Sequence, residues 1–155
     1  MSDAISLRDQ IAAQMKEAMK AGEKTRVGAL RLIMSALKDR EIEARGTGKV
    51  VSRADELALL TKMAKTRQES LTIYKDNGRD DLAAQEAAEI AVINAFLPQQ
   101  MEDGAVLDAV KTAIAEVGAL SVRDMGKVVA ALKDKHPGQM DFARASGIVK
   151  GLLGG

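Results

Sequence analysis

Apolar side chains recur every three or four positions along most of this chain, with charged side chains between them. That period is typical of amphipathic α helices, because it places the apolar residues on one helix face. Glycine, proline and capping residues interrupt the period and mark where helices begin and end. The pattern predicts four N-terminal helices, at about residues 3–21, 24–45, 53–77 and 80–97, and three shorter helices, at about residues 103–117, 122–134 and 141–153.

The apolar stripe of each segment predicts the side chains that the helix buries. For the first helix, which Ser2 or Asp3 is expected to cap, the stripe is Leu7, Ile11, Met15, Ala18 and Met19. The second helix is expected to bury Val27, Leu30, Ile33, Met34 and Leu37. In the last three helices the predicted inner faces are Val106, Val110, Ile114 and Val117; Met125, Val129 and Leu132; and Phe142, Ala145, Val149 and Leu152.

The composition agrees with an all-α protein. Of the 155 residues, 46% are hydrophobic and only 2% are aromatic, so aliphatic side chains and methionine must fill the core. Both prolines, Pro98 and Pro137, fall where a helical pattern stops, as expected of a residue that disrupts helix interiors. The predicted helices become shorter after Pro98. We therefore predict a four-helix N-terminal bundle over residues 1–98, followed by a small three-helix C-terminal module over residues 99–155.

Three charged residues lie on faces that the pattern predicts to be buried: Arg67, Glu86 and Glu89. If the two helices fold back on each other at Gly78, Arg67 lies opposite Glu89, with Glu86 one turn nearer the bend. A buried charge without a partner is costly, and one guanidinium group can serve two carboxylates. We therefore predict a structural ion cluster. The spacing of the two acids also occurs in metal sites, but the E-x-x-H pattern of a di-metal site is absent, and no metal site is predicted.

No motif in the chain predicts a catalytic residue or a cofactor. Cysteine is absent, which excludes disulfides, thiolate metal sites and cysteine nucleophiles. The single histidine, His136, directly precedes Pro137, and the sequence identifies no nucleophile or orienting acid for it. The glycine patterns of ATP and dinucleotide sites are missing as well.

No apolar run approaches the roughly 18 residues that a membrane-spanning helix needs, so no membrane partner is predicted. The N-terminus lacks the charged and apolar regions of a signal peptide. These two absences predict a cytoplasmic protein. The net charge of +1 provides no strong global field for nucleic acid, so binding to nucleic acid would need a local cationic patch.

Several short motifs share their order and spacing with those of one family. Between residues 67 and 98 they are R-x-E-S, G-R-x-D-L, E-x-x-E-I and F-L-P; between residues 124 and 153 they are D-M-G-K-V-V, G-x-x-D and I-V-K-x-L-L. With these motifs the chain resembles the GatB/YqeY family, and residues 29–38 are similar to its free-standing YqeY-like branch. The resemblance covers nearly the whole chain. It implies a helical domain in two parts, of which the larger is N-terminal.

The resemblance also implies a function. The related tail of the B subunit of tRNA-dependent amidotransferase helps to hold tRNA, whereas the kinase and amidase centres of that enzyme lie elsewhere. We therefore expect an accessory protein without its own catalytic centre, which contacts tRNA or an aminoacyl-tRNA-processing complex. Cations near helix ends and on exposed faces suit contacts to phosphate. The candidates are Arg123, Lys127, Lys133, Arg144 and Lys150.

Two alternatives stay open. The first is a protein–protein adaptor with no RNA role, whose interface is the exposed faces of the first two helices. The second, implied by family inheritance alone, is a component of a carbon–nitrogen ligase that takes an amide nitrogen from glutamine.

Overall fold

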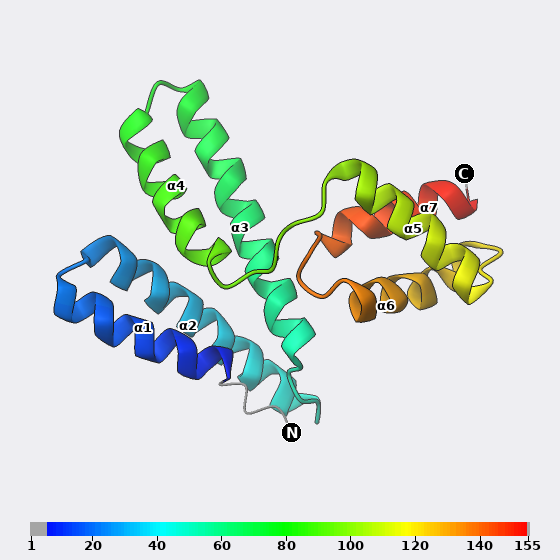
Figure 1. Ribbon diagram of the computed structural model, residues 1–155, viewed down its shortest axis with the longest axis horizontal. Helices are drawn as coiled ribbons and strands as arrows, with labels where there is room; N and C mark the ends of the chain where they lie inside the picture. The colour runs from blue at the N-terminus through cyan, green and yellow to red at the C-terminus, as the bar shows by residue number, and fades with distance from the viewer. Residues whose placement is uncertain (1–5, 155) are drawn as a thin grey trace. The chain divides into compact units, whose positions relative to one another are not determined.

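The computed structural model describes residues 6–154, and every regular element within them is helical (Figure 1). This range contains seven α helices, one short 3₁₀ helix and no strand. The all-α prediction is confirmed. The chain forms two compact units that divide between Phe96 and Leu97. No helix in the described range is long and apolar enough to cross a lipid bilayer.

The N-terminal unit consists of two helical hairpins. Its helices are α1 (Leu7–Ala21), α2 (Lys24–Gly46), α3 (Arg53–Asp76) and α4 (Asp80–Asn94). α1 packs along α2 and α3 packs along α4, while α2 also contacts α4 and, less extensively, α3 (Figure 1). Because α1 has its main contact with α2 alone, the predicted four-plus-three arrangement of bundle and module is not confirmed.

Local sequence signals set the helix ends in this unit. The Ser52 side chain accepts a hydrogen bond from the Asp55 N–H at 3.1 Å, and the Asp55 carboxylate accepts one from the Ser52 N–H at 3.0 Å, which together form a capping box. Ser6 caps α1, whereas the predicted caps Ser2 and Asp3 lie outside the described residues. Gly78 has a φ of 71°, in the left-handed region that favours glycine, and lies at the turn from α3 into α4.

The core of the N-terminal unit is aliphatic. Leu30 and Ile33 of α2 are fully buried, as the apolar stripe predicts. α1 departs from its predicted stripe, because Met19 is 55% exposed and Met15 is only half-buried. The reason is that α1 packs mainly on α2, so that only a narrow face is covered; Ala18 lies on that face and is fully buried.

The C-terminal unit is built from three mutually packed α helices. Its elements are α5 (Asp103–Val117), the 3₁₀ helix η1 (Val122–Asp124), α6 (Met125–Lys135) and α7 (Phe142–Gly154). One of the predicted inner-face positions is wrong, and others are only half-buried. Val128 is fully buried while its neighbour Val129 is half-buried, because Val128 lies one helical turn from Leu132 at the centre of the covered face. Leu152, near the end of α7, is 48% exposed.

Hydrogen bonds tie the first residues of the C-terminal unit to the loop between α6 and α7. The Gln100 side-chain amide donates to the Gly138 carbonyl at 2.6 Å, and the Met101 N–H donates to the Gln139 carbonyl at 2.8 Å. Met140, which follows in this loop, is buried. These hydrogen bonds and the buried Met140 side chain therefore hold the loop against the rest of the C-terminal unit.

Candidate functional site

Arg67 of α3 contacts two carboxylates of α4. Its Nη1 donates to Glu86 Oε2 at 3.3 Å and also to Glu89 Oε2. The side chains of Arg67, Glu86 and Glu89 are 21%, 17% and 11% exposed, so little water screens their charges. One guanidinium nitrogen therefore links α3 to α4 through both acids.

A cavity of about 370 Å³ adjoins this ion cluster. Thr66 and Ser70 of α3 contribute hydroxyl groups to its lining, and Lys62, Arg67 and Glu86 contribute charges. Lys62 and Arg67 carry two positive charges, and Glu86 and Glu89 carry two negative charges, so the net charge at this site is zero. The cavity therefore favours neither an anion nor a cation.

The five predicted phosphate contacts are all exposed and are spread over η1, α6 and α7. Lys127 and Lys133 lie about 9 Å apart along α6, as do Arg144 and Lys150 along α7. Arg144 is partly neutralised, because its Nη1 donates to Asp103 of α5 at 2.7 Å, and this hydrogen bond lowers the pKa of Asp103 below its ordinary value. The Nζ of Lys133 lies 5.9 Å from the centre of the Phe142 ring, a cation–π distance.

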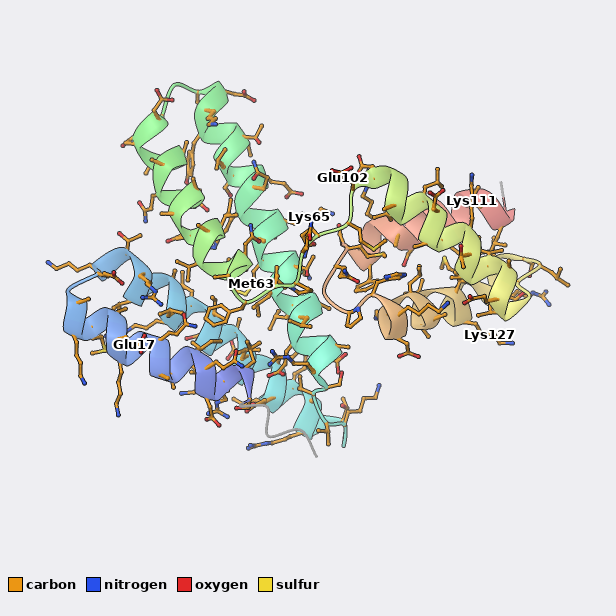
Figure 2. The ribbon with its side chains drawn as sticks, in the orientation of Figure 1. Glu17, Met63, Lys65, Glu102, Lys111 and Lys127 are labelled. Carbon is orange, nitrogen blue, oxygen red and sulfur yellow. The ribbon has the colours of Figure 1, made fainter. Side chains whose placement is uncertain are left out.

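Charge is unevenly distributed within the C-terminal unit. Residues 121–154, which contain η1, α6 and α7, carry six Lys and Arg but three Asp and Glu, whereas residues 102–117, which are α5 and its N-cap, carry one and four. Figure 2 shows Lys111 on α5 and Lys127 on α6 projecting from opposite sides of the unit. We call the exposed face of η1, α6 and α7 the basic side.

One of the three acids beside these cations is engaged with the backbone. Asp124 accepts a hydrogen bond from the Leu120 N–H at 2.9 Å and another from the Ser121 N–H at 3.4 Å. These hydrogen bonds, that of Leu120 first, lower the pKa of Asp124 below its ordinary value. The Asp124 carboxylate thus stays ionised, but it already accepts hydrogen bonds from the backbone N–H groups that precede η1.

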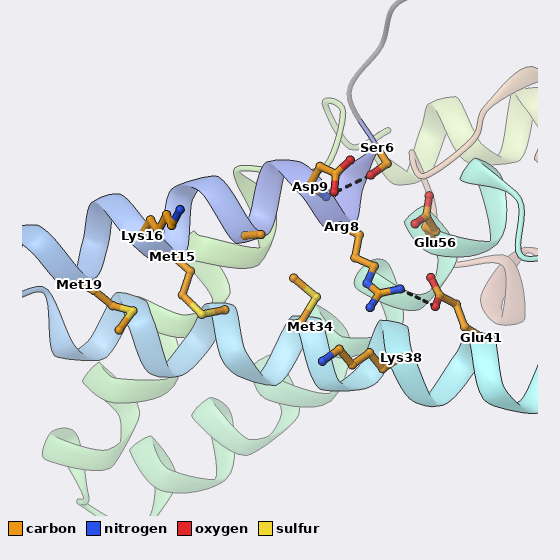
Figure 3. Close-up of a pocket in the computed structure, with 11 residues that line it drawn as sticks. Ser6, Arg8, Asp9, Met15, Lys16, Met19, Met34, Lys38, Glu41 and Glu56 are labelled. Atoms are coloured by element: carbon orange, nitrogen blue, oxygen red, sulfur yellow. Dashed lines mark hydrogen bonds and ion pairs between the residues drawn. The ribbon is translucent and has the colours of Figure 1, made fainter.

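A groove between α1 and α2 is a feature that the motifs did not indicate. It has a volume of about 700 Å³, and Figure 3 shows methionine side chains from both helices meeting in it. We call it the methionine groove; among the residues that line it are Met15, Met19, Met34, Arg8, Lys16, Lys38, Asp9, Glu41 and Glu56. The sequence placed Met15, Met19 and Met34 on the expected apolar stripes but gave no signal that they would stay uncovered.

The end of the methionine groove away from Met19 is polar. Arg8 Nη1 of α1 donates to Glu41 Oε2 of α2 at 2.8 Å, and this ion pair lies beside Glu56 of α3 (Figure 3). Burial raises the pKa of the Glu56 carboxyl above its ordinary value, Arg53 opposes that shift, and Glu41 adds to it. The charged form of the Glu56 carboxyl is therefore disfavoured in the folded protein compared with its state in water.

Replacing Glu56 with glutamine is expected to stabilise the protein slightly at neutral pH. A carboxyl whose pKa rises on folding binds more protons in the folded state, so its contribution to stability falls as the pH rises above the unfolded value of 4.5. Since Glu56 is partly exposed, we expect Tm at neutral pH to rise by only about 2 °C.

Thermal unfolding followed by circular dichroism across a pH series measures this effect. The gain should disappear below pH 4.5, where the carboxyl is protonated in both states. Glu69→Gln, on the exposed surface of α3, is the control and should leave Tm unchanged. An equal gain for Glu56→Gln at every pH would show that ionisation of Glu56 is not the cause.

His136 belongs to the loop between α6 and α7. Its Nδ1 lies 3.3 Å from Oε1 of Gln139, the residue whose backbone carbonyl accepts from Met101. Within residues 6–154, no group of three His, Cys, Asp or Glu side chains is arranged to hold a metal ion. The polar contact of His136 is thus one within the loop itself.

A family model described as "Yqey-like protein" matches residues 8–153. Among curated proteins, the chain is 36% identical over 88 residues to "Altered inheritance of mitochondria protein 41, mitochondrial" of Candida glabrata, an alignment that covers 55% of this chain and 46% of that protein. The protein of the same name from Saccharomyces cerevisiae is 29% identical over 126 residues, covering 74% of this chain and 65% of that protein. The chain therefore spans about half to two thirds of the length of these relatives.

The predicted cytoplasmic location is contradicted by these comparisons. The relatives from both yeasts are named as mitochondrial proteins. The prediction depended on the absence of a signal peptide and of a membrane span. Targeting segments are recognised separately from the folded domain and are often removed. The composition of the core-forming helices therefore carries no information about the cellular compartment.

Proposed function

Because this chain belongs to the YqeY-like family, we propose that it is an accessory protein without its own catalytic centre, which contacts tRNA or an aminoacyl-tRNA-processing complex through its basic side. The observation that carries this proposal is the separation of charge in the C-terminal unit. A chain with a net charge of +1 offers phosphate no general attraction, but six cations against three acids in residues 121–154 provide a local one.

Individual cations of the basic side differ in how available they are. Arg123, Lys127 and Lys150 are exposed and form no ion pair with another described residue, so a phosphate would not have to displace an existing partner. Arg144 would first have to leave Asp103. Lys127 and Lys150 therefore provide the clearest test among the lysines.

The spacing of these cations suits a nucleic-acid backbone rather than base recognition. Lys127 and Lys133 of α6, and Arg144 and Lys150 of α7, are each separated by about 9 Å along the helix axis, so the members of each pair can meet different phosphates of one strand. Aromatic side chains for base stacking are few in this chain, which has one tyrosine, two phenylalanines and no tryptophan. The proposed contact is thus electrostatic and largely independent of sequence.

Binding of total tRNA to the whole chain, measured by filter binding between about 50 and 200 mM salt, tests the proposal. With three or four phosphate contacts, the logarithm of the binding constant should fall with the logarithm of salt concentration with a slope of about 3. Lys127→Gln and Lys150→Gln are each expected to lower that slope by roughly 1, because each removes one contact.

Lys111→Gln is the matched control, since Lys111 lies in the same unit but on the acidic helix α5. It should leave both affinity and slope unchanged. Binding no tighter than that of a neutral helical protein, or an equal loss with the control, would contradict contact through the basic side.

The alternative of a carbon–nitrogen ligase component that uses glutamine as amide donor makes a different prediction about glutamine. Its first step would release ammonia from glutamine, which is measurable with the whole chain alone. Ammonia release that scales with protein concentration would favour this alternative over an accessory role.

A further inference from the structure

The methionine groove lies in the N-terminal unit and is not used by the proposed contact with tRNA. Its apolar part is made by Met15 and Met19 of α1 and Met34 of α2. Figure 3 shows Met15 and Met34 extending toward each other across the groove. Methionine is flexible and polarisable, and surfaces rich in it adapt to the apolar side chains of partners.

The shape of the groove favours an elongated ligand. Small-molecule sites enclose most of the surface of their ligand, whereas Met19 at the apolar end of this groove is 55% exposed. From Arg8 to Met19 the groove follows α1 for about 16 Å, given a rise of 1.5 Å per residue. That length matches about three turns of a helix lying alongside α1 and α2.

The lining of the whole groove carries three cations and three acids, but the acids Asp9, Glu41 and Glu56 lie at its polar end (Figure 3). The charges beside the methionines are cationic. Lys16 of α1 and Lys38 of α2 both line the groove, and neither forms an ion pair with another described residue. Arg8, the third cation, is already paired with Glu41 at the polar end. The open part of the groove thus combines an apolar floor with two available ammonium groups.

We propose that the methionine groove binds an amphipathic helix of a partner protein. The apolar stripe of that helix lies on Met15, Met19 and Met34, and acidic residues beside the stripe pair with Lys16 and Lys38. This is the helix-in-groove mode of recognition, in which apolar anchors recur at intervals of three and four residues. Electrostatic complementarity then selects an acidic helix over a basic one of the same apolar pattern.

The eight methionines of the chain provide the readout. The whole protein, labelled with ¹³C at its methionine methyl groups, is titrated with a synthetic helix of about twelve residues. The helix carries leucine at positions i, i+3, i+4 and i+7 and glutamate on both flanks. The methyl signals of Met15, Met19 and Met34 should shift, while those of Met125 and Met140 in the C-terminal unit should not.

A second peptide has the same leucines but lysine in place of glutamate, and should bind at least about tenfold more weakly. Lys16→Glu combined with Lys38→Glu should reverse that preference. Lys75→Glu, an exposed position at the end of α3, is the control and should leave it unchanged. Met19→Gln, which replaces an exposed side chain and so spares the core, should weaken the acidic peptide, whereas Met63→Gln on α3 should not.

Three outcomes would overturn the proposal. The first is the absence of shifts at the three methionines, and the second is equal binding of the acidic and basic peptides. The third is a concentration-dependent shift of the same three signals without peptide, which would identify a second copy of the chain as the occupant. None of these results depends on whether tRNA binds to the C-terminal unit.

Discussion

Replacing Arg67 with methionine is expected to destabilise the N-terminal unit by about 3 kcal/mol. The substitution leaves Glu86 and Glu89, whose side chains are 17% and 11% exposed, without the guanidinium that both contact. Removing one partner of a buried ion pair is strongly destabilising, because the remaining charge stays desolvated. At roughly 4 °C or more for each kcal/mol, Tm should fall by more than about 10 °C.

The single tyrosine of the chain makes this measurement specific to one unit. Tyr74 lies in α3, and tryptophan is absent, so tyrosine fluorescence during thermal unfolding follows the N-terminal unit. Arg79→Met is the control for losing an arginine, since Arg79 and Asp81 form an exposed pair with side chains 57% and 68% exposed. That variant should lose less than about 1 kcal/mol.

A compensated variant separates lost charge balance from lost packing. When Glu86→Gln and Glu89→Gln accompany Arg67→Met, no ionised group stays desolvated, and most of the lost stability should return. A Tm of Arg67→Met within about a degree of the unsubstituted protein would show that water reaches the cluster and screens it.

Replacing Leu30 with alanine is expected to destabilise the same unit by about 3 kcal/mol. Leu30 is fully buried in α2, the helix that contacts each of the other three helices of the unit. The truncation removes apolar surface from the core and leaves a cavity that the surrounding helices fill only in part. Urea unfolding, followed by the fluorescence of Tyr74, measures the change in the free energy of unfolding.

Leu32→Ala is the matched control, because it removes the same atoms from the same helix only two residues away. Leu32 is 45% exposed, so the loss should stay below about 1 kcal/mol. Similar losses at both positions would mean that the exposed face of α2 is covered in solution.

Helix ends and the better-covered helix faces follow from the sequence. The capping box joins Ser52 and Asp55, three residues apart, and the turn at Gly78 also involves only neighbouring residues, so neither depends on the rest of the fold. Leu30 is an inner-face residue by its spacing alone. Predictions fail where no other helix covers the expected face, as for Met19 of α1 and Leu152 of α7, which are 55% and 48% exposed.

Helical spacing and the turn at Gly78 are also enough to place Arg67 near Glu86 and Glu89. A hairpin with a fixed turn determines which residues of its two helices lie opposite each other, so this juxtaposition depends on local geometry. The separation of charge in the C-terminal unit is different. The chain as a whole carries a net charge of +1 and the counts over residues 99–155 cancel. Only the tertiary structure shows that Lys135 and Arg144 pair with acids of α5, whereas Lys127 and Lys150 form no ion pair with another described residue.

By itself, the sequence determined that this protein is helical, where most of its helices begin and end, and which family it belongs to; α4, which ends at Asn94 and not near residue 97, is an exception. Those properties depend on residue spacing and caps within single segments. The tertiary structure alone decided that Met15, Met19 and Met34 line a groove. An apolar stripe is buried only as far as another helix covers it, and α1 packs on α2 without comparable contact to α3 or α4. The methionines therefore stay available because of long-range packing, which the periodicity of one helix does not contain.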